Sequence, residues 1–418
     1  MKTSNIVLGI SFLSFAYTIF SADTDPDVAA GRLACIKSFL NTKVTNLALS
    51  PKGDLLAAVQ SDKLKVWKVA DMDTQKPLLE IKESCNNHHP RAEAISFHPT
   101  DETFATGCNH GCIRIYNQDG EELNYIPTED KYIADVSLDS TKKHIFDLLF
   151  HPTKKHVAIS RGYGAVEVWD LEQKNRLTKV ILHPHPIIQL AYDISGETIT
   201  ALHTHGVVNT INFITNDKEE YTTTWPYFNY KDNEQVWTDK HGRYIVHGNR
   251  DGSITLSDLS KDASYKPVFK RTAQQLGSTE IEFDQFQDQL PKEADLNKIE
   301  LLSYTTNIAA VGIDSRHKRM LIGLQQGEVL ELLWKTSKDG ESSCETRQLQ
   351  AAIEDKNHKN TFWPIRTDDK GQYFVTLMQA GNEIRQIVTS ADGSHFASAS
   401  RDGRLSVWKV LMQDETKK

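Results

Sequence analysis

Short segments of alternating apolar and polar residues recur along the chain, and pairs of segments flank a turn. The last copy is the clearest, with a strand-like segment on either side of Asp402-Gly403. Leu405 and Val407 show the period of two that a half-buried β-strand requires. Glycine takes the positive φ of such a turn without steric cost. The pattern therefore predicts antiparallel hairpins and an all-β fold.

Six further segments align on this turn and bring the number of copies to seven. The copies close at Trp67, Tyr116, Trp169, Ile211, Ser257, Leu332 and Trp408. The first five closing positions lie about 42 to 53 residues apart, close to one four-stranded unit per copy. The last two intervals are about 75 residues, so each holds roughly 30 extra residues. We place these insertions at 273–305 and 335–371, where an eighth, degenerate unit is the alternative.

Another strand precedes the hairpin in several copies and ends in a proline or glycine turn, as in the Ser-Pro-Lys-Gly of residues 50–53. With the Asp-Gly turn and the closing Trp, these motifs resemble the WD-repeat family over about residues 32–410. Trp169-Asp170 retains the dipeptide that gives the family its name. The resemblance implies a seven-bladed β-propeller, a closed ring of four-stranded sheets.

The resemblance also implies a hydrogen-bonded network of His, Ser or Thr, Asp and Trp inside each blade. The residues at these positions are His88, His183, Asp402, Trp67, Trp169 and Trp408. No copy holds the full set, because the turns that follow His88 and His183 carry His110 and His205 in place of Asp. We therefore expect apolar packing between neighbouring sheets to hold the blades together.

The two ends of the repeat predict how the ring closes. The last copy ends at Val410 after its third strand, and residues 412–418 form a polar tail. Residues 32–40 precede the first repeat and belong to no blade of their own. In the family such an N-terminal strand completes the last blade, and closure removes an open sheet edge. We expect residues 32–40 to pair with the last blade.

The first 22 residues have the pattern of a secretory signal peptide. Lys2 gives a positive start, residues 6–20 carry no charge, and the chain becomes polar after Ala22. This apolar run is shorter than the ~20 residues of a spanning helix, which favours cleavage over an uncleaved membrane anchor, the alternative. We expect residues 1–22 to be removed and 23–31 to form a linker. The mature protein would be exported, to a periplasm, the exterior or a secretory lumen.

Charge and cysteine content narrow the function classes. The net charge is −8 with both signs mixed, and no segment has the basic excess that a phosphate backbone attracts, which argues against nucleic acid as a partner. Five cysteines are an odd number without dense spacing, which does not suggest a disulfide framework. Cys108 and Cys112 flank a hairpin turn, where either a cross-strand bridge or two buried free thiols would fit.

The sequence contains no nucleophile elbow, phosphate-cradling loop or zinc-protease motif. Histidines pair at His183 and His185 and again at His203 and His205, which is the basis of a metal-binding alternative. No Cys or paired carboxylate completes a ligand set at fixed spacing. We expect neither a metal nor a cofactor.

Two function classes follow. The first is an exported, monomeric, non-enzymatic scaffold that binds protein partners through its rim of loops, as the resemblance implies. The alternative is an exported propeller enzyme, lactonase- or quinoprotein-like, with its site at the axial channel. Such a site needs acidic or His ligands at the starts of several inner strands. The inner strands here begin with apolar residues, namely Val44, Ile145, Ile187 and Ile384. A purely structural role is a third possibility.

An aromatic segment marks the predicted binding rim. Trp225, Tyr227, Phe228 and Tyr230 lie in the connection between the fourth and fifth copies, and Arg250 lies in the next turn. Connections run over the surface, and exposed aromatic residues are enriched at protein interfaces. We predict that these residues contact the partner. The alternative is that Trp225 and Phe228 pack between blades.

The two insertions are expected on opposite faces of the ring. Residues 273–305 follow a fourth strand, whereas 335–371 follow a third strand if residues 372–378 form the fourth. A fourth strand at 345–349 would instead place both insertions on one face.

Overall fold

The computed structural model is almost entirely β, and its described residues form no α-helix. One 3-10 helix, η1 (Val69–Thr74), follows the third strand of the first blade. The described residues are 32–40, 44–60, 63–74, 76–82, 92–128, 144–182, 185–204, 207–212, 235–248, 253–259, 267–271, 299–300, 308–324, 327–336, 342–350, 361–367, 373–379 and 383–411. The predicted signal peptide and the polar tail lie outside them.

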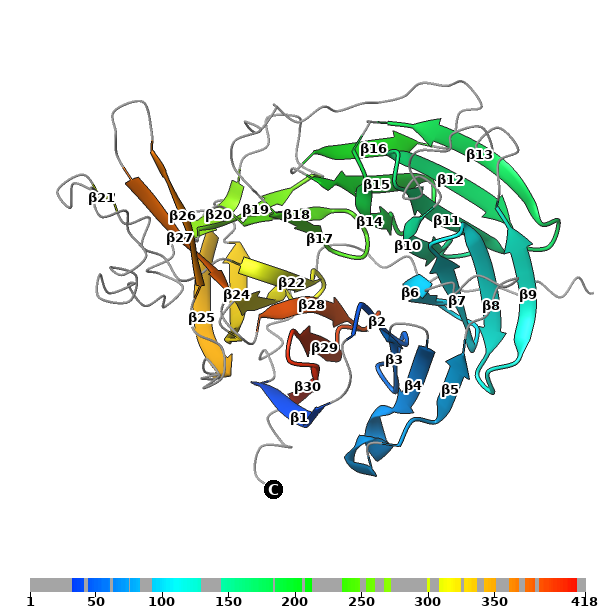
Figure 1. Ribbon diagram of the computed structural model, residues 1–418, viewed down its shortest axis with the longest axis horizontal. Coiled ribbons are helices and arrows are strands. Elements are labelled where there is room, and N and C mark those ends of the chain that lie inside the picture. The colour runs from blue at the N-terminus through cyan, green and yellow to red at the C-terminus, as the bar shows by residue number, and fades with distance from the viewer. Residues whose placement is uncertain are drawn as a thin grey trace, which may run out of the picture.

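Seven antiparallel sheets surround a central axis, so the prediction of a seven-bladed β-propeller is confirmed (Figure 1). Along the chain each blade runs from its inner strand outward. Blade 1 holds β2 (Asn46–Leu49), β3 (Leu55–Gln60), β4 (Lys63–Lys68) and β5 (Leu79–Lys82). Blade 2 holds β6 (Ala92–Phe97), β7 (Thr103–Cys108), β8 (Cys112–Asn117) and β9 (Glu122–Pro127). Blade 3 holds β10 (Ile145–Phe150), β11 (His156–Arg161), β12 (Ala165–Asp170) and β13 (Asn175–Ile181).

The remaining blades repeat this order, and blade 4 shows three strands within the described residues. Blade 4 holds β14 (Ile187–Tyr192), β15 (Thr198–His203) and β16 (Val208–Asn212). Blade 5 holds β17 (Gln235–Thr238), β18 (Tyr244–Gly248), β19 (Ile254–Asp258) and β20 (Pro267–Arg271). Blade 6 holds β22 (Ile308–Asp314), β23 (Arg319–Leu324), β24 (Val329–Thr336) and β25 (Ser342–Gln350). Blade 7 holds β28 (Ile384–Thr389), β29 (His395–Ser400), β30 (Arg404–Leu411) and β1 (Arg32–Leu40).

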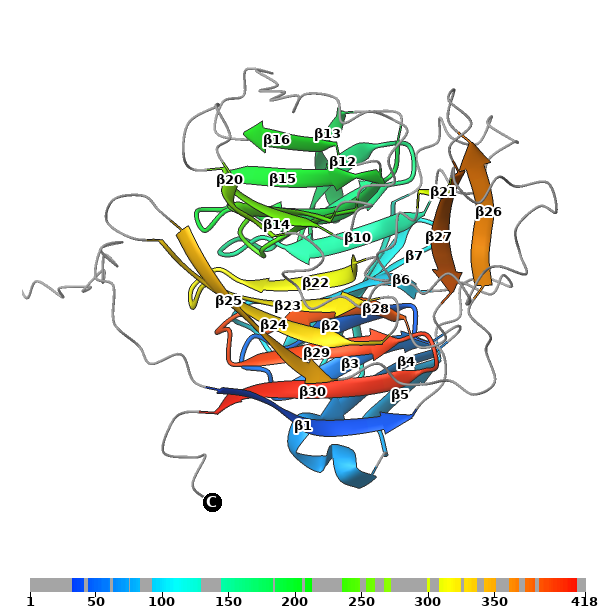
Figure 2. The same cartoon turned by 90° about the vertical axis from the view of Figure 1, so that its left-hand side faces the viewer.

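The ring closes as the sequence predicts. Strand β1 is antiparallel to β30, in a register that runs from Arg32 opposite Leu411 to Leu40 opposite Arg404 (Figure 2). The first strand of the chain therefore supplies the outer strand of the last blade. This pairing ties the two ends of the repeat together and covers the free edge of β30.

The prediction that the two insertions lie on opposite faces is wrong. Strand β25 pairs with β24 along its whole length, with Thr336 opposite Ser342, so residues 342–350 form the fourth strand of blade 6. Both long connections therefore run from an outer strand to the next inner strand. The polar composition of β25 suggested an insertion, but an outer strand faces solvent and needs few apolar residues.

Three strands form a small sheet outside the ring: β21 (Ile299–Glu300), β26 (Thr361–Thr367) and β27 (Tyr373–Gln379) (Figures 1 and 2). Strand β21 comes from the first insertion and pairs in parallel with β27, which follows the second insertion, and β27 pairs in turn with β26, which lies within the second. This sheet is not an eighth blade. It shows that the two insertions meet on one side of the propeller.

The core is divided among the seven interfaces between neighbouring blades. Each interface holds its own cluster of buried apolar side chains drawn from two adjacent sheets. Glycine permits close approach between blades 6 and 7, because a Cβ on Gly323 would lie 2.4 Å from the Ile384 side chain. Packing between sheets thus fixes the positions of the inner strands around the axis.

Candidate functional site

The propeller has two faces that differ in their connections. We define the entry face as the face that carries the hairpins between second and third strands, together with the connections that lead into each inner strand. The exit face carries the turns between first and second strands and between third and fourth strands. Every inner strand therefore begins at the entry face and ends at the exit face.

Five inner strands carry a β-bulge near their start, on the entry face. The register shifts lie in β6, β10, β14, β22 and β28. A bulge leaves an extra residue unpaired and re-aims its side chain. Four of these positions hold large side chains: Glu93, Phe146, Ile188 and Arg385. We call these four residues, with His144 at the start of β10, the crown.

The crown combines an ion pair with exposed apolar surface. His144 Nδ1 lies 3.0 Å from Glu93 Oε2, an ion pair when the imidazole is protonated, and it connects blades 2 and 3. The imidazole also lies against the Phe146 ring, with 5.8 Å between the ring centroids. Ile188 is 42% exposed, which is unusual for a large aliphatic side chain in an inner strand, and Arg385 is exposed. The crown can therefore offer both charge and apolar area to a ligand.

Polar side chains just inside the crown bridge neighbouring inner strands. Gln386 Nε2 donates to Asn46 Oδ1 at 3.0 Å, which links blade 7 to blade 1. Asn46 Nδ2 donates to the Glu93 carbonyl at 2.7 Å, which links blade 1 to blade 2. The backbone of Glu93 is thus held by the neighbouring blade, so one residue of the crown has a fixed position.

Asp147 and Gln189 provide the same bridging in blades 3 to 5. The amide of Leu190 donates to Asp147 Oδ2 at 2.7 Å, and Gln189 Nε2 donates to the Thr238 carbonyl at 3.3 Å. Burial raises the pKa of Asp147 to about 7, although hydrogen bonds from the Leu190 and Leu148 amides oppose this shift. Asp147 follows Phe146 directly, so its bonds also fix the backbone that carries this part of the crown.

The hairpins of blades 2 and 3 add a buried network to the entry face. The structure joins Cys108 and Cys112 as a disulfide, which decides between the two alternatives left open by the sequence. In blade 3, Glu167 accepts hydrogen bonds from Arg161 Nη2 at 3.0 Å, Tyr163 Oη at 3.1 Å and Trp169 Nε1 at 3.0 Å. Glu167 is 1% exposed. A single carboxylate thus organises this hairpin.

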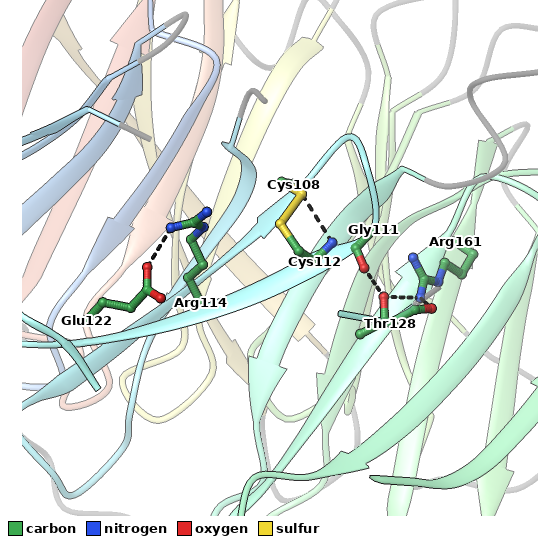
Figure 3. The surroundings of a disulfide bond; sticks show 7 residues. All are labelled: Cys108, Gly111, Cys112, Arg114, Glu122, Thr128 and Arg161. Atoms are coloured by element: carbon green, nitrogen blue, oxygen red, sulfur yellow. Dashed lines mark hydrogen bonds and ion pairs between the residues drawn. A yellow bond between two sulfur atoms is a disulfide. The ribbon is translucent and has the colours of Figure 1, made fainter. Parts of the chain in front are cut away.

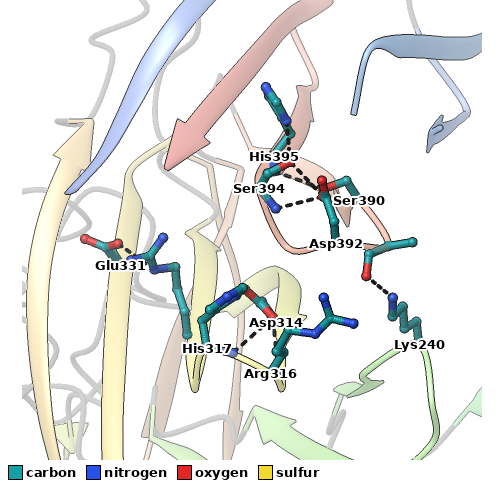
Figure 4. A network of polar contacts seen from close by, with 11 residues as sticks. Lys240, Asp314, Arg316, His317, Glu331, Ser390, Asp392, Ser394 and His395 are labelled. Carbon is teal, nitrogen blue, oxygen red and sulfur yellow. Dashed lines mark hydrogen bonds and ion pairs between the residues drawn. The ribbon is translucent and has the colours of Figure 1, made fainter. Parts of the chain in front are cut away.

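The exit face uses its polar groups to connect blades (Figure 4). Lys240 Nζ, from blade 5, donates to the carbonyl of Ala391 in blade 7. In blade 6, Asp314 Oδ2 lies 2.6 Å from His317 Nδ1, and a Cβ on Gly393 would lie 2.3 Å from the same carboxylate oxygen. These groups serve the assembly of the ring, which leaves the entry face as the better candidate for binding.

The three tryptophans predicted as structural residues are buried, but their partners differ. Trp408 Nε1 donates to Ser398 Oγ at 3.1 Å, which is part of the network implied by the family resemblance. Trp169 uses Glu167 instead, and Trp67 is 1% exposed in the interface between blades 7 and 1. Asp402 is exposed in its turn and accepts a hydrogen bond from the Arg404 amide at 3.1 Å. The other predicted site residues lie outside the described residues: His88, His183, Trp225, Tyr227, Phe228, Tyr230 and Arg250.

The sequence analysis did not identify Glu93 and His144. Both are polar residues at the starts of inner strands, which is where an axial enzyme site would place its ligands. The signal was present as a charged residue between two alanines, Ala92 and Ala94.

Across the part of the chain that the structure describes, no group of three or more His, Cys, Asp or Glu is arranged to hold a metal ion. Among the same residues, no helix is long and apolar enough to cross a membrane.

Comparisons with known proteins agree with the ring. A family model described as "WD domain, G-beta repeat" matches residues 80–117 and 372–409. A chain in a solved structure titled "Crystal Structure of Mitotic Checkpoint Complex" is similar, with a TM-score of 0.57 and 11% sequence identity, over 97% of this chain and 100% of that chain. A comparison with curated proteins finds no match. The repeat matches support a WD40 β-propeller, and the structural likeness shows the fold alone.

Proposed function

We propose that this chain, a propeller with WD40 repeats, is a non-enzymatic scaffold that binds protein partners through its entry face after export from the cytoplasm. The observation that carries the proposal is the crown, where repeated bulges place charged and apolar side chains on one face. Hydrogen bonds between blades hold that backbone in place before any partner arrives. A preorganised surface loses less entropy on binding, which favours affinity.

Two isoleucines of blade 4 allow a matched test. Ile188 belongs to the crown, whereas Ile194 is 75% exposed in the turn after β14, on the exit face. We expect Ile188→Ser to weaken partner capture by about ten- to a hundredfold, since burying one aliphatic side chain contributes roughly 1.5–3 kcal/mol and each 1.4 kcal/mol is tenfold in affinity. Ile194→Ser should leave capture unchanged. Quantitative mass spectrometry of proteins captured from the exported fraction checks this, and equal loss in both variants would contradict the proposal.

The aromatic segment is proposed as a second part of the same surface. Tyr227→Ala with Tyr230→Ala should weaken capture while the melting temperature stays nearly constant, because exposed tyrosines contribute to binding more than to folding. A large fall in melting temperature with capture intact would assign these side chains to the core. Trp225, Phe228 and Arg250 are assigned to the surface on the same grounds.

The enzyme alternative has one observation in its favour. Glu93 and His144 form a carboxylate–imidazole pair at two inner-strand starts, where an axial site would lie. Such a pair orients an imidazole for proton transfer. The discriminating measurement is hydrolysis of a lactone panel by the wild type and by His144→Gln. Hydrolysis lost in the variant would favour the enzyme, and absence of hydrolysis in the wild type would favour the scaffold.

A further inference from the structure

The hairpin between β7 and β8 is closed by a disulfide on the entry face (Figure 3). The Cα atoms of Cys108 and Cys112 are 5.4 Å apart, a separation that a disulfide spans without backbone movement. The Gly111 amide donates to the Cys108 carbonyl at 3.0 Å, and Gly111 has a φ of 81°. The turn therefore depends on a glycine and on the sulfur link across its base.

Buried contacts lead from this turn into blade 3. The Gly111 carbonyl accepts hydrogen bonds from the Thr128 amide, at 3.0 Å, and from the Thr128 hydroxyl. The Thr128 carbonyl accepts in turn from Arg161 Nη2 at 3.1 Å (Figure 3). Thr128 and Arg161 are each 2% exposed, so water cannot easily replace these partners. The position of the Gly111 carbonyl thus influences the position of the guanidinium.

Arg161 connects the Thr128 carbonyl to the hairpin of blade 3. Its Nη2 donates to Glu167 Oε2, and the same carboxylate accepts from the hydroxyl of Tyr163 within that hairpin. The Gly164 amide closes the turn by donating to the Arg161 carbonyl at 3.0 Å. Two hairpins on the entry face are therefore connected through four buried residues.

We propose that the Cys108–Cys112 disulfide is a redox-controlled lock on the entry face, and that its reduction loosens the hairpins of blades 2 and 3 while the ring stays folded. The sequence separation of the two cysteines is 4. So short a loop constrains the unfolded chain little, and the apolar cluster between blades 2 and 3 holds the ring independently. The oxidising compartment and the effect on partner binding both rest on the proposed function, whereas the connection between the two hairpins does not.

A dithiol reductant can reduce the Cys108–Cys112 disulfide. The dithiol gives up two electrons and two protons and becomes a disulfide, the S–S bond breaks, and Cys108 and Cys112 become thiols. A disulfide oxidant reverses the reaction by the same exchange. An exported protein would keep the lock closed, since disulfides persist in oxidising compartments.

Hydrogen exchange of the full chain, with and without dithiothreitol, tests the lock. We expect the amides of Thr128 and Gly164 to exchange about five- to tenfold faster after reduction, as each loses support from the network. The Gly403 amide, which donates to the Ser400 carbonyl at 3.0 Å in blade 7, is the matched control and should not change. Circular dichroism should show the same β content in both states.

Thr128→Val tests whether the effect of the disulfide reaches the hairpin of blade 3 through the Thr128 side chain. The variant keeps the disulfide and the main-chain hydrogen bonds of Thr128, but it lacks the hydroxyl that donates to the Gly111 carbonyl and accepts from Arg161 Nη2. Reduction should therefore change exchange at Gly164 less than in the wild type. Cys108→Ser with Cys112→Ser should exchange fast in both conditions. The proposal is overturned if protein from the exported fraction alkylates at both cysteines without a reductant, or if reduction leaves Gly164 unchanged in the wild type. Failure to capture a partner in either redox state would overturn the proposed function and leave this result intact.

Discussion

Removing the carboxylate of Glu167 tests how much the buried network of blade 3 contributes to stability. Glu167→Ala would remove the carboxylate to which the guanidinium of Arg161, itself 2% exposed, donates at 3.0 Å. Tyr163 and Trp169 would each lose a hydrogen-bond acceptor. Breaking a buried ion pair from one side costs about 3–5 kcal/mol, because the remaining charge stays desolvated. We expect the free energy of unfolding to fall by about that amount.

Urea denaturation followed by tryptophan fluorescence measures the change, and two comparisons show its origin. Glu172→Ala removes the partner of Lys155 in an exposed pair whose side chains are 69% and 65% accessible, so its unfolding should match that of the wild type. Arg161→Leu combined with Glu167→Leu should recover part of the loss, since the buried guanidinium is removed together with the carboxylate. Arg176 and Lys179, the other cations near Glu167, have side chains that are 30% and 23% exposed. A Glu167→Ala midpoint equal to that of Glu172→Ala would refute the reasoning.

Three further predictions follow from single contacts. Burial raises the pKa of Asp147 to about 7, so the folded state holds a proton that the unfolded state has released. The contribution of Asp147 to stability should therefore fall as pH rises from about 4 through 7, by at most about 1.4 kcal/mol per pH unit, and urea titrations at several pH values should show this slope in the difference between the wild type and Asp147→Asn. Gly393→Ala should lower stability by at least about 1–2 kcal/mol, because Gly393 has a φ of 72° and its added Cβ would collide with Asp314, and thermal unfolding checks it. Intact-mass analysis of the exported protein should show loss of residues 1–22, and recovery of a chain beginning at Met1 would contradict it.

Much of the fold could be predicted because the repeat is a local pattern. Alternation along each strand and the turn at Asp402-Gly403 depend only on neighbouring residues. The role of residues 32–40 was implied by the resemblance to the WD-repeat family, and it agrees with the need to cover an open sheet edge. β25 was misassigned because it is mostly polar and only Cys344 and Leu349 pack against apolar clusters of the core, so its pairing with β24 is what identifies it.

The candidate site was harder to predict because it depends on register. A bulge exists only when two strands pair, and it is the bulge that places Glu93 on the entry face. His144 is adjacent to Glu93 in space but not in sequence. No pattern within either segment could have shown that the two side chains meet.

The sequence alone determined the all-β fold class and the number of repeats, because these follow from period and count, and its resemblance to the WD-repeat family implied the way that the ring closes. Tertiary structure alone decided which polar groups meet between blades. His144 meets Glu93 between blades 2 and 3, and Asn46 Nδ2 donates to the Glu93 carbonyl between blades 1 and 2. The physical reason is that hydrogen bonds and disulfides act over a few ångströms, whereas residues from different blades are brought that close only by the packing of the apolar interfaces.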